Sequence, residues 1–279
     1  MPNYPSKDLP AQQAAFAGVR TISLSQPLRW LVLAWKDLLR GGWLSLMHGV
    51  VMALTGVVLF GLAGQRFWFL VGAFSGFLLV APILATSLYA ISRAIARGEP
   101  VRFALILHTW LNWRDGRIVP WGKGHWRLMH FGLLLAVAGT GWVLTSASLI
   151  TLMAPTPITA PMAFIEHVVL APQGYLFELW LVLGGVLVAP IFASTVITVP
   201  LLLDRDISVK MAVLNSWRVI LANPLPMAFW GALIMVLTFL GFASALLGLI
   251  LLVPLLGHAS WHAYCDLLDA SALPEREPC

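Results

Sequence analysis

The sequence predicts an all-α membrane protein with six transmembrane helices arranged as three hairpins. Two observations predict this class. First, 59% of the residues are hydrophobic and only 10% are charged, with a mean hydropathy of +0.86, whereas soluble domains carry about 25% charged residues. Second, the apolar part of the chain contains an internal repeat, which is typical of membrane bundles built by duplication.

The repeat is marked by a Gly that is followed six residues later by a Pro. Its three copies are Gly76 and Pro82, Gly184 and Pro190, and Gly248 and Pro254. Without gaps, residues 76–104 match residues 184–212 at ten of 29 positions. A Pro permits a kink in a transmembrane helix, and a Gly allows a neighbouring backbone to approach closely. We therefore expect these residues to shape helix packing; a gate or ligand cavity at the kinks is the alternative.

Six apolar stretches approach or exceed the roughly 20 residues that are needed to cross a bilayer. The predicted spans are residues 44–64, 67–90, 129–153, 174–202, 225–241 and 243–264. The last two form one long apolar stretch. We divide it near Gly241, because Gly248 and Pro254 then lie inside a helix like the other two copies.

The basic residues predict the orientation of the spans. With six spans, both termini lie on the same side as residues 91–128 and 203–224. Of all Lys and Arg residues, only Arg66 lies on the other side, and cytoplasmic segments carry such an excess. We therefore expect a bacterial inner-membrane protein with both termini in the cytoplasm. The net charge of +5 then favours contacts with anionic lipid headgroups and not with nucleic acid.

The ends of the chain are polar. Residues 1–26 lack the apolar core of a signal peptide, and we predict that they form a disordered cytoplasmic tail, as do residues 269–279. Residues 27–268 then form a single six-helix domain with repeat units of about 27–92, 101–203 and 207–266. Cys265 and Cys279 both fall on the cytoplasmic side, where free thiols are expected.

Each predicted hairpin is preceded by an amphipathic segment. Apolar residues recur at helical spacing in residues 28–39, 103–111 and 209–221. In the first segment, charged residues that include Asp37 occupy the opposite face. In the third, Ser208 is a candidate N-cap, and Asn223 followed by Pro is a stop signal. We expect interfacial helices whose apolar faces lie in the headgroup boundary; a docking surface for a partner is the alternative.

Four histidines are candidate metal ligands. The tripeptide Leu-Met-His ends at His48 and again at His130, and His258 and His262 form an i, i+4 pair on one helical face. We predict that all four converge near the cytoplasmic end of the bundle. Such a cluster can bind a transition metal or a haem iron. However, no nearby carboxylate is spaced to orient the rings, so hydrogen-bonded structural histidines without a cofactor are the preferred interpretation; pH sensing is a third.

Several short strings identify a family. They are Ile91-Ser92-Arg93, Arg97-Gly98-Glu99-Pro100, Asp204-Arg205-Asp206, Asn223-Pro224, Leu240-Gly241-Phe242 and Gly257-His258-Ala259-Ser260-Trp261-His262-Ala263-Tyr264. With these strings, residues 25–268 resemble the domain of unknown function 2189 family, a set of predicted bacterial integral membrane proteins. The chain departs from the pattern at Cys265, where a basic residue is expected. The resemblance implies a location and a fold, but no mechanism.

Signals of catalysis or of ion-coupled transport are missing from the sequence. No Asp, Glu, Lys or Arg lies in the middle of a predicted span, and no nucleophile or nucleotide-binding motif is present. We therefore expect a non-enzymatic accessory or assembly partner of a larger membrane complex, with another membrane protein as its partner. One alternative is a small-molecule channel or carrier with a path between the Gly/Pro-kinked helices. A second is a metal- or haem-binding membrane protein that uses the four histidines.

Overall fold

The computed structural model describes residues 16–63, 67–73, 76, 85–111, 125–171 and 174–275. Apart from one short strand pair, the regular elements of this part of the chain are all helices, which confirms the predicted all-α class. Its elements are β1 (Gly18–Val19), α2 (Gln26–Gly41), α3 (Trp43–Ala63), α5 (Thr86–Ala96), α6 (Phe103–Leu111), α7 (His125–Met153), α8 (Pro161–Phe164), the π-helix η1 (Ile165–Val169), α9 (Leu176–Thr195), α10 (Thr198–Asp204), α11 (Val209–Ala222), α12 (Pro224–Ala243), α13 (Leu249–Leu267) and β2 (Leu268–Asp269).

Within the described residues, four helical segments are long and apolar enough to cross a membrane. They are Trp43–Leu62, Phe131–Met153, Leu176–Asp204 and Pro224–Ala243, and they coincide with the first, third, fourth and fifth predicted spans. Residues 77–84 of the second predicted span lie outside the described residues. The sixth corresponds to α13, which is less apolar because its C-terminal half contains two histidines and an aspartate.

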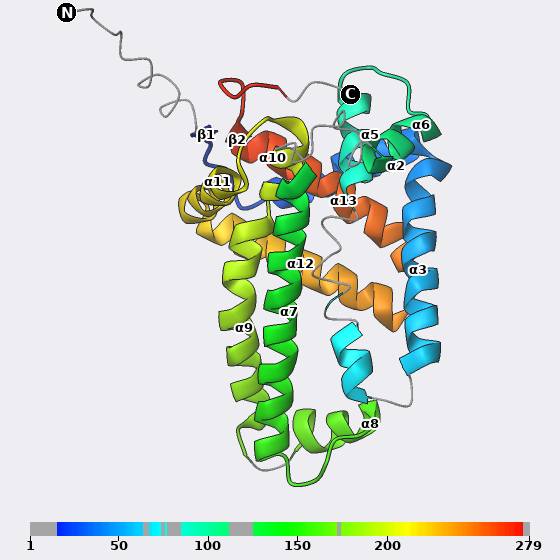
Figure 1. Ribbon diagram of the computed structural model, residues 1–279, viewed down its shortest axis with the longest axis vertical. Helices are drawn as coiled ribbons and strands as arrows, with labels where there is room; N and C mark the ends of the chain where they lie inside the picture. The colour runs from blue at the N-terminus through cyan, green and yellow to red at the C-terminus, as the bar shows by residue number, and fades with distance from the viewer. Residues whose placement is uncertain are drawn as a thin grey trace, which may run out of the picture.

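The helices divide the molecule into a long body and one crowded end. In Figure 1, α3, α7 and α9 run along the long axis, whereas α2, α5, α6, α10 and α11 gather at the end where β1 pairs with β2. We call this the β1–β2 end. The short helix α8 lies at the opposite end. The first and last strands therefore share one end, which agrees with an even number of membrane crossings.

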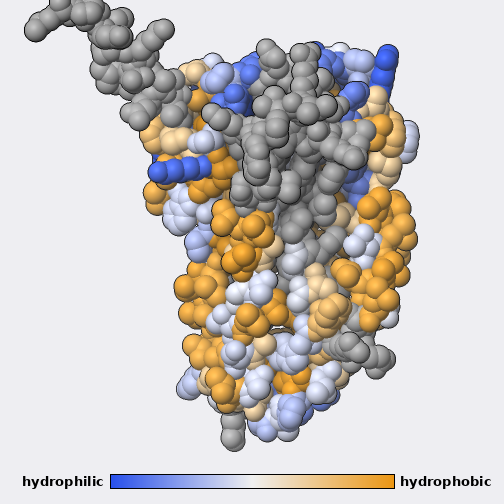
Figure 2. All heavy atoms as spheres, in the orientation of Figure 1, coloured by the Kyte–Doolittle hydropathy of each residue, from blue (hydrophilic) through white to orange (hydrophobic). Residues whose placement is uncertain are grey.

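Hydrophobic side chains cover much of the body. On α3, the side chains of Val51, Leu54 and Val58 are 55%, 59% and 57% exposed. Figure 2 shows hydrophobic residues along both flanks of the body, and hydrophilic residues toward the β1–β2 end. Such a surface is unfavourable in water, but it is the expected outer surface of helices that lipid surrounds.

The three amphipathic segments form helices at the β1–β2 end, as predicted. On α2, the apolar side chains of Val32 and Leu39 are 57% and 67% exposed, which suits a face that lies in the headgroup boundary. The N-cap of α11 is also confirmed, because the Ser208 hydroxyl accepts a hydrogen bond from the backbone N–H of Met211 at 3.3 Å. Helix α11 ends at Ala222, directly before the predicted stop.

The prediction of disordered ends does not hold for the terminal residues that the structure describes. Ala17 is buried, and its backbone N–H donates to Asn215 Oδ1 at 3.2 Å. Ile22 donates in the same way to Asn223 Oδ1 at 2.9 Å. At the other end of the chain, Leu273 is also buried. Amide side chains of α11 and the strand pair hold these segments in place; residues 1–15 and 276–279 lie outside the described residues.

The last two predicted spans meet at a turn slightly later than predicted. Helix α12 continues to Ala243, and Gly248 is the N-cap of α13, so it does not lie inside a helix. The turn uses left-handed backbone at Ala245 and Leu246, with φ of 53° and 71°. In the second copy of the repeat, Gly184 and Pro190 both lie inside α9, whereas in the third copy only Pro254 lies inside a helix. Pro82 of the first copy lies outside the described residues.

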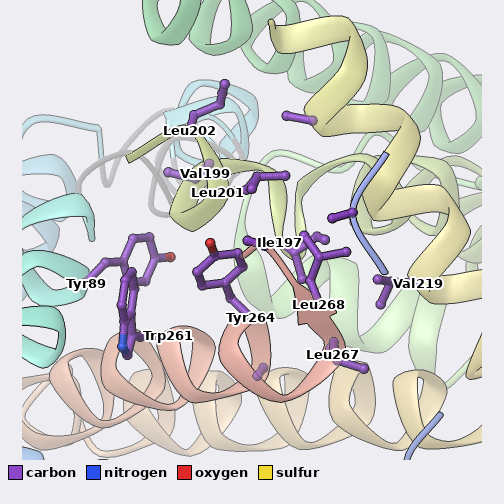
Figure 3. Close-up of a cluster of buried hydrophobic side chains, with 14 of the residues drawn as sticks. Tyr89, Ile197, Val199, Leu201, Leu202, Val219, Trp261, Tyr264, Leu267 and Leu268 are labelled. Atoms are coloured by element: carbon purple, nitrogen blue, oxygen red, sulfur yellow. The ribbon is translucent and has the colours of Figure 1, made fainter. Parts of the chain in front are cut away.

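Helix α13 is the centre of the packing. It contacts α2, α3, α5, α10 and α12. Figure 3 shows Tyr89, Trp261 and Tyr264 in the main cluster of buried hydrophobic side chains. At the edge of this cluster, Trp30 and Trp230 pack edge to face with their ring centroids 5.5 Å apart, a favourable geometry for aromatic pairs.

Among the described glycines, Gly49, which lies outside the Gly/Pro repeat, makes the closest contact with the backbone of another helix. A Cβ atom on Gly49 would lie 2.2 Å from the carbonyl oxygen of Ile250, so α3 and α13 touch backbone to backbone. By contrast, a Cβ atom on Gly184 would meet the Trp142 side chain at 3.1 Å, and one on Gly76 would meet nothing within 4 Å. The tight contact that small residues permit between membrane helices therefore lies at Gly49.

We expect Gly49→Ala to destabilise the protein by about 1–3 kcal/mol, because the backbone of Ile250 must move to admit the methyl group. Thermal unfolding of the purified protein in detergent measures the effect. Gly61→Ala is the matched control in the same helix, because a Cβ atom there meets nothing within 4 Å. Equal melting temperatures for the two variants would contradict the close contact between α3 and α13.

Candidate functional site

The Asp37 carboxylate is buried, although the sequence pattern places it on the charged face of α2. Asp37 is only 4% exposed, whereas the apolar side chains of Leu28, Val32 and Leu39 on the same helix are exposed. The buried face carries Trp30, Ala34, Asp37 and Gly41 at intervals of four, three and four residues, and it lies against α13. The expectation that Asp37 meets the membrane surface is therefore wrong, because α13 covers that face of the helix.

Two side chains compensate for the burial of Asp37. The Ser92 hydroxyl donates to Asp37 Oδ2 at 2.8 Å, and His262 Nε2 lies 2.8 Å from the same oxygen. Burial acts to raise the pKa of the Asp37 carboxyl, but the hydrogen bonds from His262 and Ser92, together with the electrostatic attraction of the His262 and His258 rings, outweigh it, so its pKa lies below the ordinary value. Asp37 is therefore a stable buried carboxylate.

The hydrogen bonds continue from Ser92 to a second histidine. His258 is fully buried; its Nδ1 lies 2.7 Å from Ser92 Oγ, and its Nε2 lies 3.0 Å from Ser45 Oγ. Because Ser92 donates its one hydroxyl proton to Asp37, it must accept from His258 Nδ1–H. A neutral His258 ring then accepts from Ser45 at Nε2. We call Asp37, Ser45, Ser92, His258 and His262 the Asp37 network; it joins α2, α3, α5 and α13.

His48 has its own partners close to this network. Its Nδ1 lies 2.8 Å from the carbonyl oxygen of Leu44, and its Nε2 lies 2.5 Å from Ser87 Oγ. A carbonyl can only accept, so Nδ1 carries the proton and Nε2 accepts from Ser87. The ring is thus held by one neighbour on α3 and one on α5.

The structure brings together three of the four predicted histidines, but as hydrogen-bonded groups. His258 and His262 meet in the Asp37 network, and His48 lies on the adjoining part of α3. Within the described residues, no group of three or more His, Cys, Asp or Glu side chains is arranged to hold a metal ion. The side chain of His130 lies outside the described residues, so the four-histidine site stays a prediction.

An apolar cavity of about 720 Å³ adjoins these histidines. Helices α3, α5, α12 and α13 supply most of its lining, which consists mainly of Leu, Ile, Val, Met and Phe side chains. The lining also includes a few polar residues: His48, Tyr89, Thr238 and Ser260. A cavity of this volume, with apolar walls and few polar groups, is typical of a small-molecule site.

Two of the polar residues mark the side of the cavity nearest the Asp37 network. His48 lines the cavity on α3, and Ser260 lines it on α13, two residues after His258. The Ser260 hydroxyl donates a hydrogen bond to the carbonyl oxygen of Leu256 at 2.8 Å. The cavity can therefore accept a mostly apolar molecule with one hydrogen-bonding group, which would lie beside the His48 imidazole and the Ser260 hydroxyl.

Sequence reasoning missed Asp37, Ser45 and Ser92 as members of this site. One signal was present: the Trp30-Ala34-Asp37-Gly41 stripe recurs at the spacing of a buried helix face and contains two small residues. The opposite face of the helix is more hydrophobic, and its stronger periodicity predicts that this other face, and not the stripe, is the one withdrawn from water. Ser45 and Ser92 carry no comparable signal, because single serines are common in apolar helices.

Comparison with known proteins supports the membrane assignment. Residues 69–204 match the family model described as a predicted integral membrane protein (DUF2189). The matched range contains the strings at residues 91–93 and 97–100 and ends at Asp204, whereas the strings at residues 223–224, 240–242 and 257–264 lie outside it. Neither the curated proteins nor the solved structures contain a match to this chain.

We expect Asp37→Ala to destabilise the protein by about 1–3 kcal/mol, because the buried Ser92 hydroxyl and His262 ring lose their acceptor. Asp37→Asn retains one oxygen acceptor, and we expect a smaller loss. Chemical or thermal unfolding in detergent measures both. Lys36→Ala is the control, because Lys36 is the exposed neighbour on the same helix and its loss changes stability by no more than about 0.5 kcal/mol. Equal effects at the two positions would show that Asp37 is not a buried acceptor.

Proposed function

We propose that this chain, part of which matches a family of predicted integral membrane proteins, is a non-enzymatic protein of the bacterial inner membrane that binds a lipid-like molecule. The observation that carries the proposal is the apolar cavity of about 720 Å³ between α3, α5, α12 and α13, with hydrogen-bonding groups on one side. A molecule with a long apolar part and one polar group has the chemistry that these walls require.

The proposed topology is multi-pass, with six spans, three hairpins and a threefold repeat of interfacial helix plus hairpin. Residues 67–90 form the second span and α13 belongs to the sixth. The pairing of β1 with β2 at one end supports an even number of crossings, and the excess of Lys and Arg supports a cytoplasmic location for that end. In this topology, the histidine side of the cavity lies toward the cytoplasm.

The proposal that the protein is not an enzyme is supported by the burial of a serine–histidine pair. Ser45 and His258 resemble a nucleophile and its base, since Ser45 Oγ lies 3.0 Å from His258 Nε2. Both side chains are 0% exposed, and neither is in the lining of the cavity. Among the described residues, the hydroxyl group is therefore closed off from solvent and from the cavity, which favours a structural role for the pair.

A binding site accounts for the cavity better than a channel does. The channel expected from the sequence would run between the helices that contain Pro82, Pro190 and Pro254. The described lining residues come from α3, α5, α6, α12 and α13, and none comes from α9, which contains Pro190. The cavity thus adjoins only one of the two described kinked helices.

We expect Thr238→Trp to reduce binding at least severalfold, because the indole fills part of the cavity. The probe is a phosphatidylglycerol with a photoactivatable diazirine on its acyl chain, incorporated into nanodiscs with the full-length protein. Peptide mapping measures the crosslinks to Leu252, Val253 and Leu256, which line the cavity on α13.

Val236→Trp is the matched control for that experiment. It adds the same side chain two residues earlier on α12, at a position that is 51% exposed and outside the lining. Crosslinks to α13 should then stay at the level of the unmodified protein. If Thr238→Trp and Val236→Trp leave the crosslinks to α13 equally strong, the lipid does not enter the cavity and the proposal fails.

The accessory role in a larger membrane complex is the second candidate. It is favoured by exposed hydrophobic residues in the segment between the spans that contain α7 and α9. There, Met162, Leu170 and Tyr175 are 60%, 67% and 82% exposed. Exposed apolar residues outside the membrane spans are typical of protein interfaces.

Purification from native membranes at the natural expression level tests this second role. We expect a partner to co-purify with the unmodified protein and to be lost from a Leu170→Ser, Tyr175→Ser variant. Arg102→Gln, an exposed change at the β1–β2 end, is the control. A protein that runs alone as a monomer, in mild detergent and in nanodiscs alike, would remove the basis for an accessory role.

A further inference from the structure

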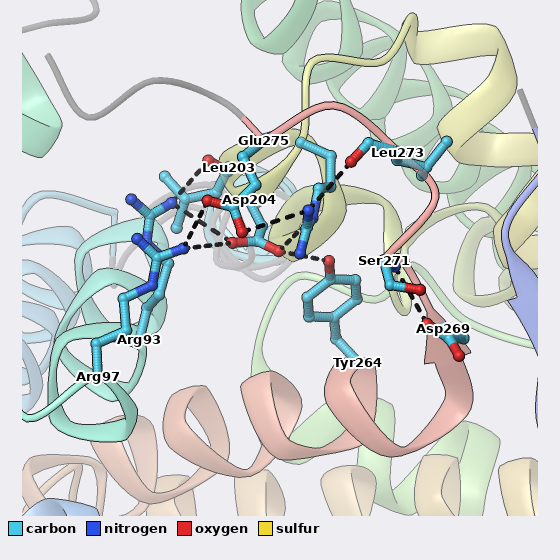
Figure 4. Close-up of polar contacts among 10 residues, drawn as sticks. Arg93, Arg97, Leu203, Asp204, Tyr264, Asp269, Ser271, Leu273 and Glu275 are labelled. Carbon is cyan, nitrogen blue, oxygen red and sulfur yellow. Dashed lines mark hydrogen bonds and ion pairs between the residues drawn. The ribbon is translucent and has the colours of Figure 1, made fainter. Parts of the chain in front are cut away.

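Three arginines converge on one buried carboxylate at the β1–β2 end. Asp204, the last residue of α10, accepts from Arg205 Nε at 2.9 Å and from the Tyr264 hydroxyl at 2.8 Å, both at Oδ2. Its Oδ1 lies 3.6 Å from Arg93 Nη1 and 4.0 Å from Arg97 Nη2. Figure 4 shows Arg93 and Arg97 extending toward Asp204 from one side and Tyr264 from another.

Asp204 cannot neutralise this cluster alone. Three guanidinium groups face one buried carboxylate, and a guanidinium keeps its charge in a protein. The second acid is Glu275, whose carboxylate lies 3.5 Å from Arg97 Nη2 and 3.5 Å from Arg205 Nη1. Glu99 adds a longer-range attraction for Arg93. Arg97 and Arg205 each form ion pairs with both Asp204 and Glu275. Without Glu275, Asp204 would be the one carboxylate that both guanidinium groups share.

The Glu275 carboxylate is held only weakly beside the guanidinium groups of Arg97 and Arg205. Its side chain is 61% exposed, and exposed ion pairs of this kind contribute little to stability. The backbone of the segment that carries it is held by a hydrogen bond from Arg205 Nη1 to the Leu273 carbonyl at 3.1 Å and by one from the Asp206 N–H to the Pro274 carbonyl at 3.0 Å, beside an antiparallel bridge between Arg205 and Glu275. The carboxylate can therefore leave the guanidinium groups while the segment stays attached.

The chemistry of the cluster fits a phosphate group. Guanidinium groups bind phosphate oxygens through paired, charge-assisted hydrogen bonds, and a phosphate has more acceptor oxygens than a carboxylate. Asp204 is also the last residue of a segment that is apolar enough to cross the membrane, so the cluster lies at the level where lipid phosphates occur.

We infer that Arg93, Arg97 and Arg205 form a binding site for a phosphate group, for which the phosphate and the Glu275 carboxylate compete. The phosphate belongs to an anionic phospholipid of the adjoining leaflet or to a soluble phosphate compound. Its binding releases the Glu275 carboxylate from the guanidinium groups, while the backbone of residues 273–275 stays attached. This site is separate from the cavity, and it does not depend on the function proposed for the cavity.

Native mass spectrometry of the full-length protein tests the site. The protein is delipidated in a phosphate-free, non-ionic detergent and titrated with dioleoyl phosphatidylglycerol. We expect Glu275→Gln to increase lipid affinity about twofold to fivefold, because it removes a competitor worth about one exposed ion pair. Arg97→Gln should decrease the affinity about tenfold, because it removes charge-assisted hydrogen bonds.

Two further measurements complete the test. Arg102→Gln removes an exposed arginine outside the cluster and should leave the affinity unchanged. Inorganic phosphate, added at millimolar concentration, distinguishes the sources. If it displaces the lipid in a manner that depends on Arg97, the site takes soluble phosphate as well; if it does not, the site selects the lipid headgroup. Equal affinities for Arg97→Gln and Arg102→Gln, or no gain from Glu275→Gln, would overturn the inference.

Discussion

The buried carboxylate of Asp37 is the constraint on which the packing of four helices depends. An unpaired charge in a protein interior is very unfavourable, so its acceptor oxygens must be supplied with donors. Ser92 on α5 and His262 on α13 supply them, each at 2.8 Å. Because Ser92 then has to accept from His258, and His258 from Ser45, the same carboxylate also determines how α3 lies against α13.

Helix α13 serves two purposes because its two halves differ. Its first half is apolar and touches the backbone of α3 at Gly49. Its second half carries His258 and His262, which bond to the Asp37 network. The cavity lies along the apolar part and ends near Ser260, so the change in polarity along one helix gives the cavity an apolar body and a polar side.

Asp37 and Asp204, the two buried acids among the described residues, have different surroundings and different uses. Asp37 is surrounded by a hydroxyl and imidazole groups and is closed off from solvent by α13. Asp204 is surrounded by guanidinium groups, one of which is about one-third exposed, and Glu275 connects that cluster to the surface. A closed, internally satisfied network stabilises a fold, whereas an open cluster with surplus positive charge is suited to bind an anion.

The sequence by itself determined the class, the membrane location and the bounds of most helices. Helices α2, α6, α11 and α12 begin and end within a few residues of their predicted positions, because helical periodicity, capping residues and apolar runs are local properties. The resemblance to a family of predicted integral membrane proteins was likewise confirmed over residues 69–204.

Only the tertiary structure decided that Asp37 is buried, that Gly49 makes the close contact and that the described terminal residues are packed. Asp37 lies 55 residues from Ser92 and 225 from His262 in the chain. A polar helix face has the same pattern whether water or a distant helix covers it, so which of the two occurs depends on long-range packing.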